Sequence, residues 1–216
     1  MNLDAARIRA ASCLVPMRRT FLLIAILTVL VFPVAALQSS LELGINLSYN
    51  NADELPEESG GSGIPYLDRI AIGLEMRGNI SNFQTTIAGD ISILDTQTML
   101  FSGIFGAGIS VDLFKYLKFG VTTGPKVSYL YQDEVKNVTN DGEVGEPENF
   151  FDALYRGYFH HRIMLDILAG PVISIGVAYT LPTTFSLAEG NWDKFIPGRD
   201  EFSEGQIAVC IQMKVF

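Results

Sequence analysis

The last eleven residues, 206–216, alternate between apolar and polar side chains with few exceptions. One parity is apolar from Ile207 to Val215, whereas the other is mostly polar and includes Gln206, Gln212 and Lys214. Successive side chains of a β-strand point to opposite faces, so this pattern predicts a strand with one apolar and one polar face. A soluble sandwich and a transmembrane barrel can both contain such a strand, so the rest of the chain must decide between them.

Seven further segments repeat this design. They lie at 41–49, 67–80, 83–93, 101–113, 117–131, 159–167 and 172–181. Each has about the 9–11 residues that a tilted strand needs to cross a bilayer. Pro125 lies on the apolar face of the fifth segment, where we expect a bulge or a local break in strand pairing.

The connections between these segments alternate in length. Short links follow the second, fourth and sixth segments, at 78–82, 114–116 and 168–170. Long polar links follow the first, fifth and seventh, at 50–66, 132–158 and 182–202, and the remaining link at 94–100 is short. A barrel with an even number of strands and both ends of the chain in the periplasm has short turns there and long loops outside. The pattern therefore predicts an all-β fold, an eight-stranded antiparallel up-and-down transmembrane β-barrel.

Composition agrees with this fold. Hydrophobic residues make up 48% of the chain although its net charge is -9. A helical membrane protein needs several apolar runs of about 20 residues, and the sequence lacks them. A barrel distributes its apolar residues in alternation instead.

The first 36 residues read as an N-terminal signal peptide. Arg18 and Arg19 precede a twelve-residue apolar run at 21–32, and small residues at 34–36 provide a cleavage site. Because residues 1–16 fit this pattern poorly, Met17 is a candidate for the true start. Cleavage leaves residues 37–216 as the barrel, with 11 basic and 23 acidic residues and a net charge of -12. This charge disfavours nucleic acid as a partner.

The segment pattern resembles the small eight-stranded outer-membrane proteins, the group of the OmpA transmembrane domain, OmpX and OmpW. OmpW is the best match over residues 37–216, because the barrel stands alone without a periplasmic domain. The resemblance implies a protein of the bacterial outer membrane that contacts outer-membrane lipid and, during export, the barrel-assembly machinery. It also implies a narrow channel or passage for small solutes or small hydrophobic molecules.

The polar parity of the strands places acidic and basic side chains in the lumen. These lumen-lining candidates are Glu42, Arg69, Glu75, Arg77, Asp90, Asp112, Lys118, Lys126, Arg162, Asp166 and Lys214. An eight-stranded barrel is just wide enough for its side chains to fill, and charges there persist only if they are paired or hydrated. The charges therefore form either an ion-paired plug or the wall of a narrow polar pore.

The long links are acidic, which suits exposure to solvent. The alternative function is thus a sealed barrel that binds a host-surface ligand through its acidic extracellular loops. We expect no enzymatic activity, cofactor or metal. His160 and His161 are adjacent in a strand, so their side chains point to opposite faces and cannot bind one metal together.

Overall fold

The computed structural model describes residues 39–50, 69–94, 97–138, 144–145, 149–199 and 201–216. The predicted signal peptide and start at Met17, and nearly all of the predicted link at 50–66, lie outside the described residues. Residues 38–216 belong to one compact unit. Within the described ranges, no helix is both long and apolar enough to span a membrane.

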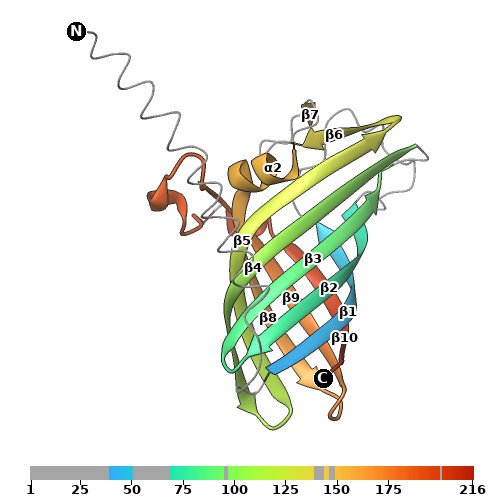
Figure 1. The fold of residues 1–216 in the computed structure, drawn as a ribbon, viewed down its shortest axis with the longest axis vertical. Helices are drawn as coiled ribbons and strands as arrows, with labels where there is room; N and C mark the ends of the chain where they lie inside the picture. Colours follow the sequence, from blue (N-terminus) through green and yellow to red (C-terminus); the bar gives the residue numbers. More distant parts are fainter. Residues whose placement is uncertain (1–38, 51–68, 95–96, 139–143, 146–148, 200) are drawn as a thin grey trace. The chain divides into compact units, whose positions relative to one another are not determined.

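The described strands form a closed antiparallel barrel of eight strands, which confirms the predicted fold class (Figure 1). The order around the barrel is β4-β3-β2-β1-β10-β9-β8-β5, and β4 pairs with β5 to close it. The eight strands are β1 (Ser39–Asn50), β2 (Ile70–Ile80), β3 (Phe83–Ile93), β4 (Thr98–Phe114), β5 (Leu117–Gln132), β8 (Tyr158–Leu168), β9 (Ile173–Ser186) and β10 (Gln206–Lys214).

The alternation in sequence sets the register of these pairs. Where β1 meets β10, Ile45 lies opposite Ile211 and both are exposed on the outside, whereas the next pair, Asn46 and Cys210, is buried inside. A shift of one residue would exchange the two faces of a strand. The requirement for an apolar outer face and a polar interior therefore determines the register of each strand pair.

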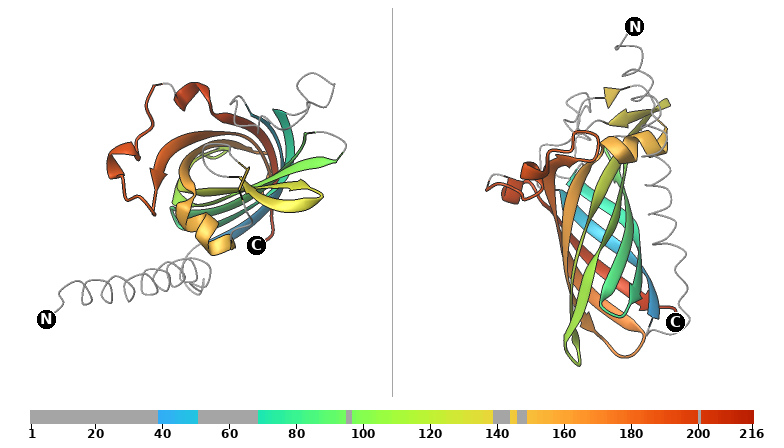
Figure 2. Two further views of the ribbon diagram at one scale, coloured as in Figure 1. Left: turned by 90° about the horizontal axis from the view of Figure 1, so that it is seen from above. Right: turned by 60° about the vertical axis from the view of Figure 1, so that its left-hand side comes forward.

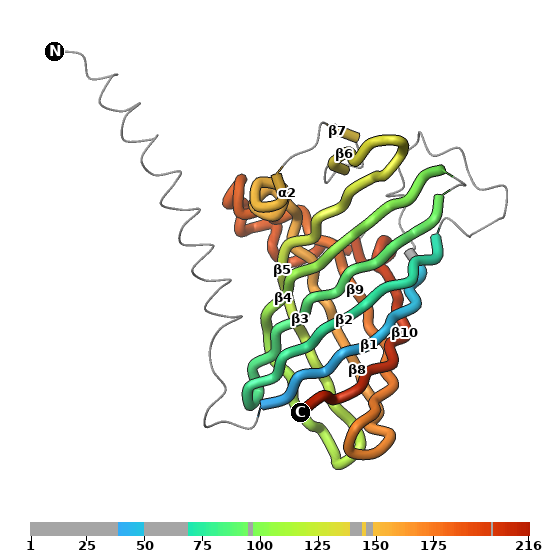
Figure 3. Tube along the Cα trace, turned by 45° about the vertical axis from the view of Figure 1, so that its right-hand side comes forward, coloured from blue at the N-terminus to red at the C-terminus, as the bar shows by residue number. Residues whose placement is uncertain are grey.

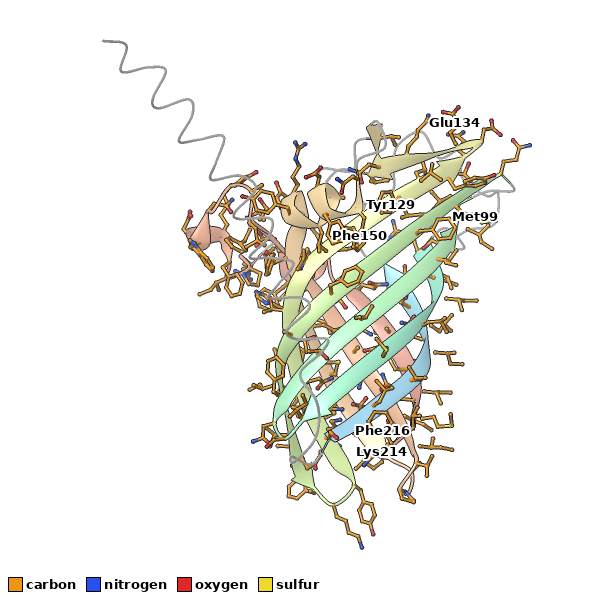
Figure 4. All side chains as sticks on the ribbon, in the orientation of Figure 1. Met99, Tyr129, Glu134, Phe150, Lys214 and Phe216 are labelled. Carbon is orange, nitrogen blue, oxygen red and sulfur yellow. The ribbon has the colours of Figure 1, made fainter. Side chains whose placement is uncertain are left out.

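The turns at one end of the barrel, here called the turn end, are short. Ser81 and Gly170 have positive φ values of 55° and 107° in the turns after β2 and β8. At Gly170 the positive φ has no steric cost, because glycine lacks a Cβ atom. The opposite end, here called the loop end, carries the other connections. Figure 4 shows Lys214 and Phe216 at the turn end and Phe150 at the loop end.

The long polar link predicted at 132–158 contains regular structure that the sequence pattern did not indicate. Strand β6 (Glu134–Val138) pairs with β5, β7 (Val144–Gly145) pairs with β6, and α2 (Phe150–Arg156) follows. Asp133 makes the tight turn between β5 and β6 with a φ of 59°. The sheet thus extends past the closed barrel at the loop end (Figure 3).

Several predicted strand ends also differ from the structure. β4 begins at Thr98 rather than at residue 101, within the predicted link at 94–100. The C-terminal ends of β9 and β10 differ as well. β9 continues to Ser186 rather than ending at residue 181, and its register against β8 shifts between Tyr158 and His160. β10 ends at Lys214, although the Val215 amide still donates a hydrogen bond to the Leu41 carbonyl at 2.7 Å. Pairing with a neighbour, which a single strand's pattern does not encode, decides both ends.

Pro125 causes a local break in pairing, one of the two expected effects. β4 and β5 pair from Thr98 to Ile104 and resume at Ala107 opposite Thr123, in unchanged register. The pairing of β5 with β8 stops at Pro125. Proline lacks the N–H that would continue the ladder, so β5 leaves β8 here and turns to β6.

Candidate functional site in the barrel lumen

The centre of the lumen holds four charged side chains in one ion-paired network. Arg77 Nε donates to Glu75 Oε1 at 2.8 Å, and Arg77 Nη1 donates to Asp166 Oδ2 at 2.5 Å. Arg162 Nη2 donates to Glu75 Oε2 at 2.7 Å. All four side chains are at most 4% exposed. Two arginines and two carboxylates balance, so the network is neutral as a whole.

These ion pairs connect opposite walls of the barrel. Glu75 and Arg77 come from β2, whereas Arg162 and Asp166 come from β8. In the closed order of eight strands, β2 and β8 are separated by three strands in either direction. The Arg77–Asp166 and Arg162–Glu75 pairs therefore cross the lumen.

A second layer lies between this network and the turn end. Lys118 Nζ donates to Glu42 Oε1 at 2.8 Å, again between opposite strands, β5 and β1. With the Gln212 amide oriented so that both of its polar atoms have partners, its oxygen accepts from Arg77 Nη2 at 2.9 Å and its nitrogen donates to Glu42 Oε2 at 3.2 Å. Gln212 thus joins the two layers.

Further bonds extend the network toward the loop end. Arg162 Nη1 donates to Thr180 Oγ1 at 2.8 Å, and Gln206 Nε2 donates to Asp90 Oδ2 at 3.1 Å. The buried Cys210 thiol lies 3.4 Å from Glu75 Oε2. The inward side chains are the odd-numbered ones in β2, which supplies Glu75, and the even-numbered ones in the other contributing strands.

The structure brings six of the eleven predicted lumen residues together: Glu42, Glu75, Arg77, Lys118, Arg162 and Asp166. The ion pairs described above include none of the other five. Asp90 is buried beside Gln206, and Arg69 and Lys126 are half-buried toward the loop end. Asp112 and Lys214 are exposed at the turn end, where they line a polar cavity of about 490 Å³.

Uncharged side chains of the inward parity also line the lumen, although the predicted set contains only charged residues. Gln206 and Gln212 stand on the polar parity of β10, and Thr180 stands on that of β9. Their parity placed them inside, but selecting only charged residues left them out. Amide and hydroxyl groups complete the hydrogen bonds that buried ions require, so every polar residue of the inward parity was a candidate.

The outer surface contrasts with the lumen. Among the described residues of the eight barrel strands, the outward parity carries no Asp, Glu, Lys or Arg. Its exposed side chains are mostly Ile, Leu, Val and Phe. A contiguous apolar surface around the whole circumference is a feature of barrels that face lipid.

No protein-family model and no curated protein matches this sequence. Nine chains of solved structure are similar to it. A barrel described under "De novo design of transmembrane beta-barrels" is 12% identical with a TM-score of 0.44, covering 82% of this chain and 95% of that one. Ail, the attachment invasion locus protein of Yersinia pestis, is 10% identical with a TM-score of 0.44, covering 82% and 97%. Its complex with the heparin analogue sucrose octasulfate is 11% identical with a TM-score of 0.43, covering the same shares.

Proposed function

We propose that this protein is a sealed, non-enzymatic β-barrel of the bacterial outer membrane that displays binding segments at the cell surface. The observation that carries the proposal is the pair of ion bridges between β2 and β8 at the centre of the lumen. The barrel anchors the chain, and the segments at the loop end meet the partner.

The outward face of the strands supports the membrane location. Leu74, near the middle of β2, is 71% exposed, and its outward neighbours Ile45 and Ile72 are also exposed and apolar. Water disfavours such a surface by about 25 cal/mol per Å². Lipid around the barrel removes this cost for the whole ring of outward apolar side chains, which is called the belt here.

The burial of the ion pairs supports a closed lumen. A solute crossing the centre must separate Arg77 from Asp166 or Arg162 from Glu75. Separating buried charges is costly, because removing one partner of such a pair costs about 3–5 kcal/mol. Eight strands also leave little room beyond what side chains fill.

The loop-end structure supports a binding role. β6 and α2 provide ordered surface beyond the closed barrel, and Asp133 and Glu134 are exposed at the turn between β5 and β6. Acidic side chains on this ordered extension suit a basic partner, either a host-surface ligand or an envelope component.

The second candidate function is the narrow channel implied by the OmpW resemblance. The polar cavity at the turn end favours it, because it leads to Lys118 in the second layer of the lumen. In this alternative the central ion pairs are a gate, and a stimulus must separate them before a small solute passes.

Conductance distinguishes the two functions. The protein, purified from the outer membrane of an expressing bacterium and inserted into planar bilayers, is expected to show no discrete channels. The fourfold variant Glu75→Ala, Arg77→Ala, Arg162→Ala and Asp166→Ala is expected to conduct, because it removes the side chains that fill the centre. Heat-dependent gel mobility checks that both proteins are folded.

The matched control is Asp112→Ala combined with Lys214→Ala, which removes two charges at the exposed turn end. We expect this control to remain closed. Discrete channels in the unsubstituted protein would overturn the sealed barrel in favour of the channel.

A further inference from the structure

The segment between β9 and β10 folds against the outside of the barrel. This segment, residues 187–205 with residue 200 not described, is called the flap here. Seen from above, it lies outside the ring of strands (Figure 2). Its two 3-10 helices, η2 (Trp192–Lys194) and η3 (Glu201–Ser203), both contact β9. The long polar link predicted at 182–202 therefore begins later than expected, after Ser186, and contains two short helices.

An aromatic cluster attaches the flap to the wall. Phe185 belongs to the outward parity of β9 yet is completely buried. Its ring centroid lies 5.1 Å from that of Phe159 on β8, 4.7 Å from that of Trp192 and 5.3 Å from that of Phe195. Trp192 and Phe195 thus cover wall residues that would otherwise face outward.

Hydrogen bonds from two outward side chains of the wall fix the flap further. His161 Nε2 on β8 lies 2.8 Å from the Phe195 carbonyl oxygen, and the Tyr179 hydroxyl on β9 donates to the Phe202 carbonyl. Asn191 Nδ2 donates to the Thr184 carbonyl at 3.0 Å. The flap is therefore bound to the face that carries the apolar belt, along two neighbouring strands.

The flap presents apolar side chains on its outer side. Trp192 is 69% exposed, Ile196 is 80% exposed and Phe202 is 55% exposed. Toward the turn end, the belt continues on β9 and β10 with the exposed residues Val177 and Ile207. Exposed apolar groups clustered on one small segment indicate a partner, and here they continue the surface that faces lipid.

α2 also packs aromatic side chains against the outside of the barrel. Phe150, at the start of α2, makes an edge contact with the outward Phe105 of β4 at 5.4 Å, and Phe151 packs against Phe150 at 5.5 Å. Both phenylalanines stay partly exposed. Phe105 lies close to the point where Pro125 pairs with Phe159, so the two aromatic groups share one level of the barrel.

We infer that the flap is an interfacial anchor that lies in the headgroup region of the outer leaflet, with Trp192, Ile196 and Phe202 inserted among the lipid chains. Tryptophan and other aromatic residues favour this boundary between polar and apolar surroundings. By sequence the flap carries five acidic residues against Lys194 and Arg199, a net charge of -3. Apolar insertion rather than attraction to anionic lipid therefore drives the contact. The inference rests on the proposed membrane location of the barrel.

The sequence contains a single tryptophan, so its fluorescence reports on the flap alone. The full protein is reconstituted into phosphatidylcholine vesicles whose acyl chains are brominated either near the headgroup or near the chain end. We expect loss of Trp192 emission with the shallow bromine, a smaller loss with the deep bromine, and weak quenching by aqueous acrylamide. Replacing Ile196→Ser and Phe202→Ser together is expected to reduce the shallow quenching.

A second probe separates failure of this inference from failure of the proposed membrane location. Trp192→Phe combined with Leu74→Trp moves the only tryptophan to the middle of the belt, where the deep bromine is expected to quench it most. If this probe responds but Trp192 is quenched only by acrylamide, the flap faces water and the inference is wrong. If Trp192 is shielded from bromine and acrylamide alike, this chain or a second copy of it covers Trp192, and the lipid assignment is likewise overturned. If neither probe responds to bromine, the barrel is not in the bilayer and both proposals fail.

Discussion

Replacing Glu75 with Gln is expected to lower the free energy of unfolding of the barrel by about 3–5 kcal/mol. Glu75 accepts hydrogen bonds from both Arg77 and Arg162. A neutral amide of the same shape therefore removes the negative charge that compensates these two buried guanidinium groups. Arg77 keeps Asp166, whereas Arg162 keeps the hydroxyl of Thr180. Urea titration of the protein folded in lipid vesicles, followed by circular dichroism, measures the change.

The control for this substitution is Asp112→Asn, which also neutralises one carboxylate of the inward parity. Asp112 is exposed at the turn end, so its loss is expected to change stability by less than about 0.5 kcal/mol. Combining Glu75→Gln with Arg162→Met removes both charges of one bridge and is expected to cost less than the sum of the single changes. Wild-type stability for Glu75→Gln alone would mean that the network does not hold the barrel together.

Replacing Leu74 with Arg is expected to destabilise the barrel in a bilayer by about 2–4 kcal/mol. Leu74 lies on the outward face of β2 opposite Ile45 and Gly89, near the middle of the strand. An arginine there must carry its charge into hydrocarbon. Folding titrations in phospholipid vesicles measure this cost.

The matched control places the same side chain at the rim of the belt. Phe114 ends β4 at the turn end and is 74% exposed, so Phe114→Arg lies near the headgroups and is expected to cost only about 0–1 kcal/mol. The two positions have nearly equal exposure, so depth in the membrane is the main difference between them. Equal costs at both positions would argue against a lipid-facing belt.

The alternation of each segment was sufficient to predict the eight strands and the two faces of the barrel. Asn46 and Cys210 point inward between outward-facing neighbours, as their parity predicts. The tight turn that contains Ser81 was also predictable, because a short polar link joins two strong strands. These features depend on the conformation of a few consecutive residues, which the local sequence controls.

The long connections were predicted less well. Phe185, Trp192, Phe195 and Ile196 fall within the predicted link at 182–202, which we interpreted as polar because of its acidic residues. Their spacing follows neither the strand nor the helix period, so no local pattern reveals the cluster. It forms because the end of β9 and the outward Phe159 of β8 offer an apolar surface next to the flap.

The alternation along each strand dictates which side chains enter the lumen, because a period of two follows from the backbone of a single strand. Which of these side chains meet one another depends on how the strands assemble. Glu75 and Arg162 are 87 residues apart in the chain, and closure of the barrel brings their strands to opposite walls at matching heights. Contact between them depends on the stagger and tilt of all eight strands together, which no single segment encodes.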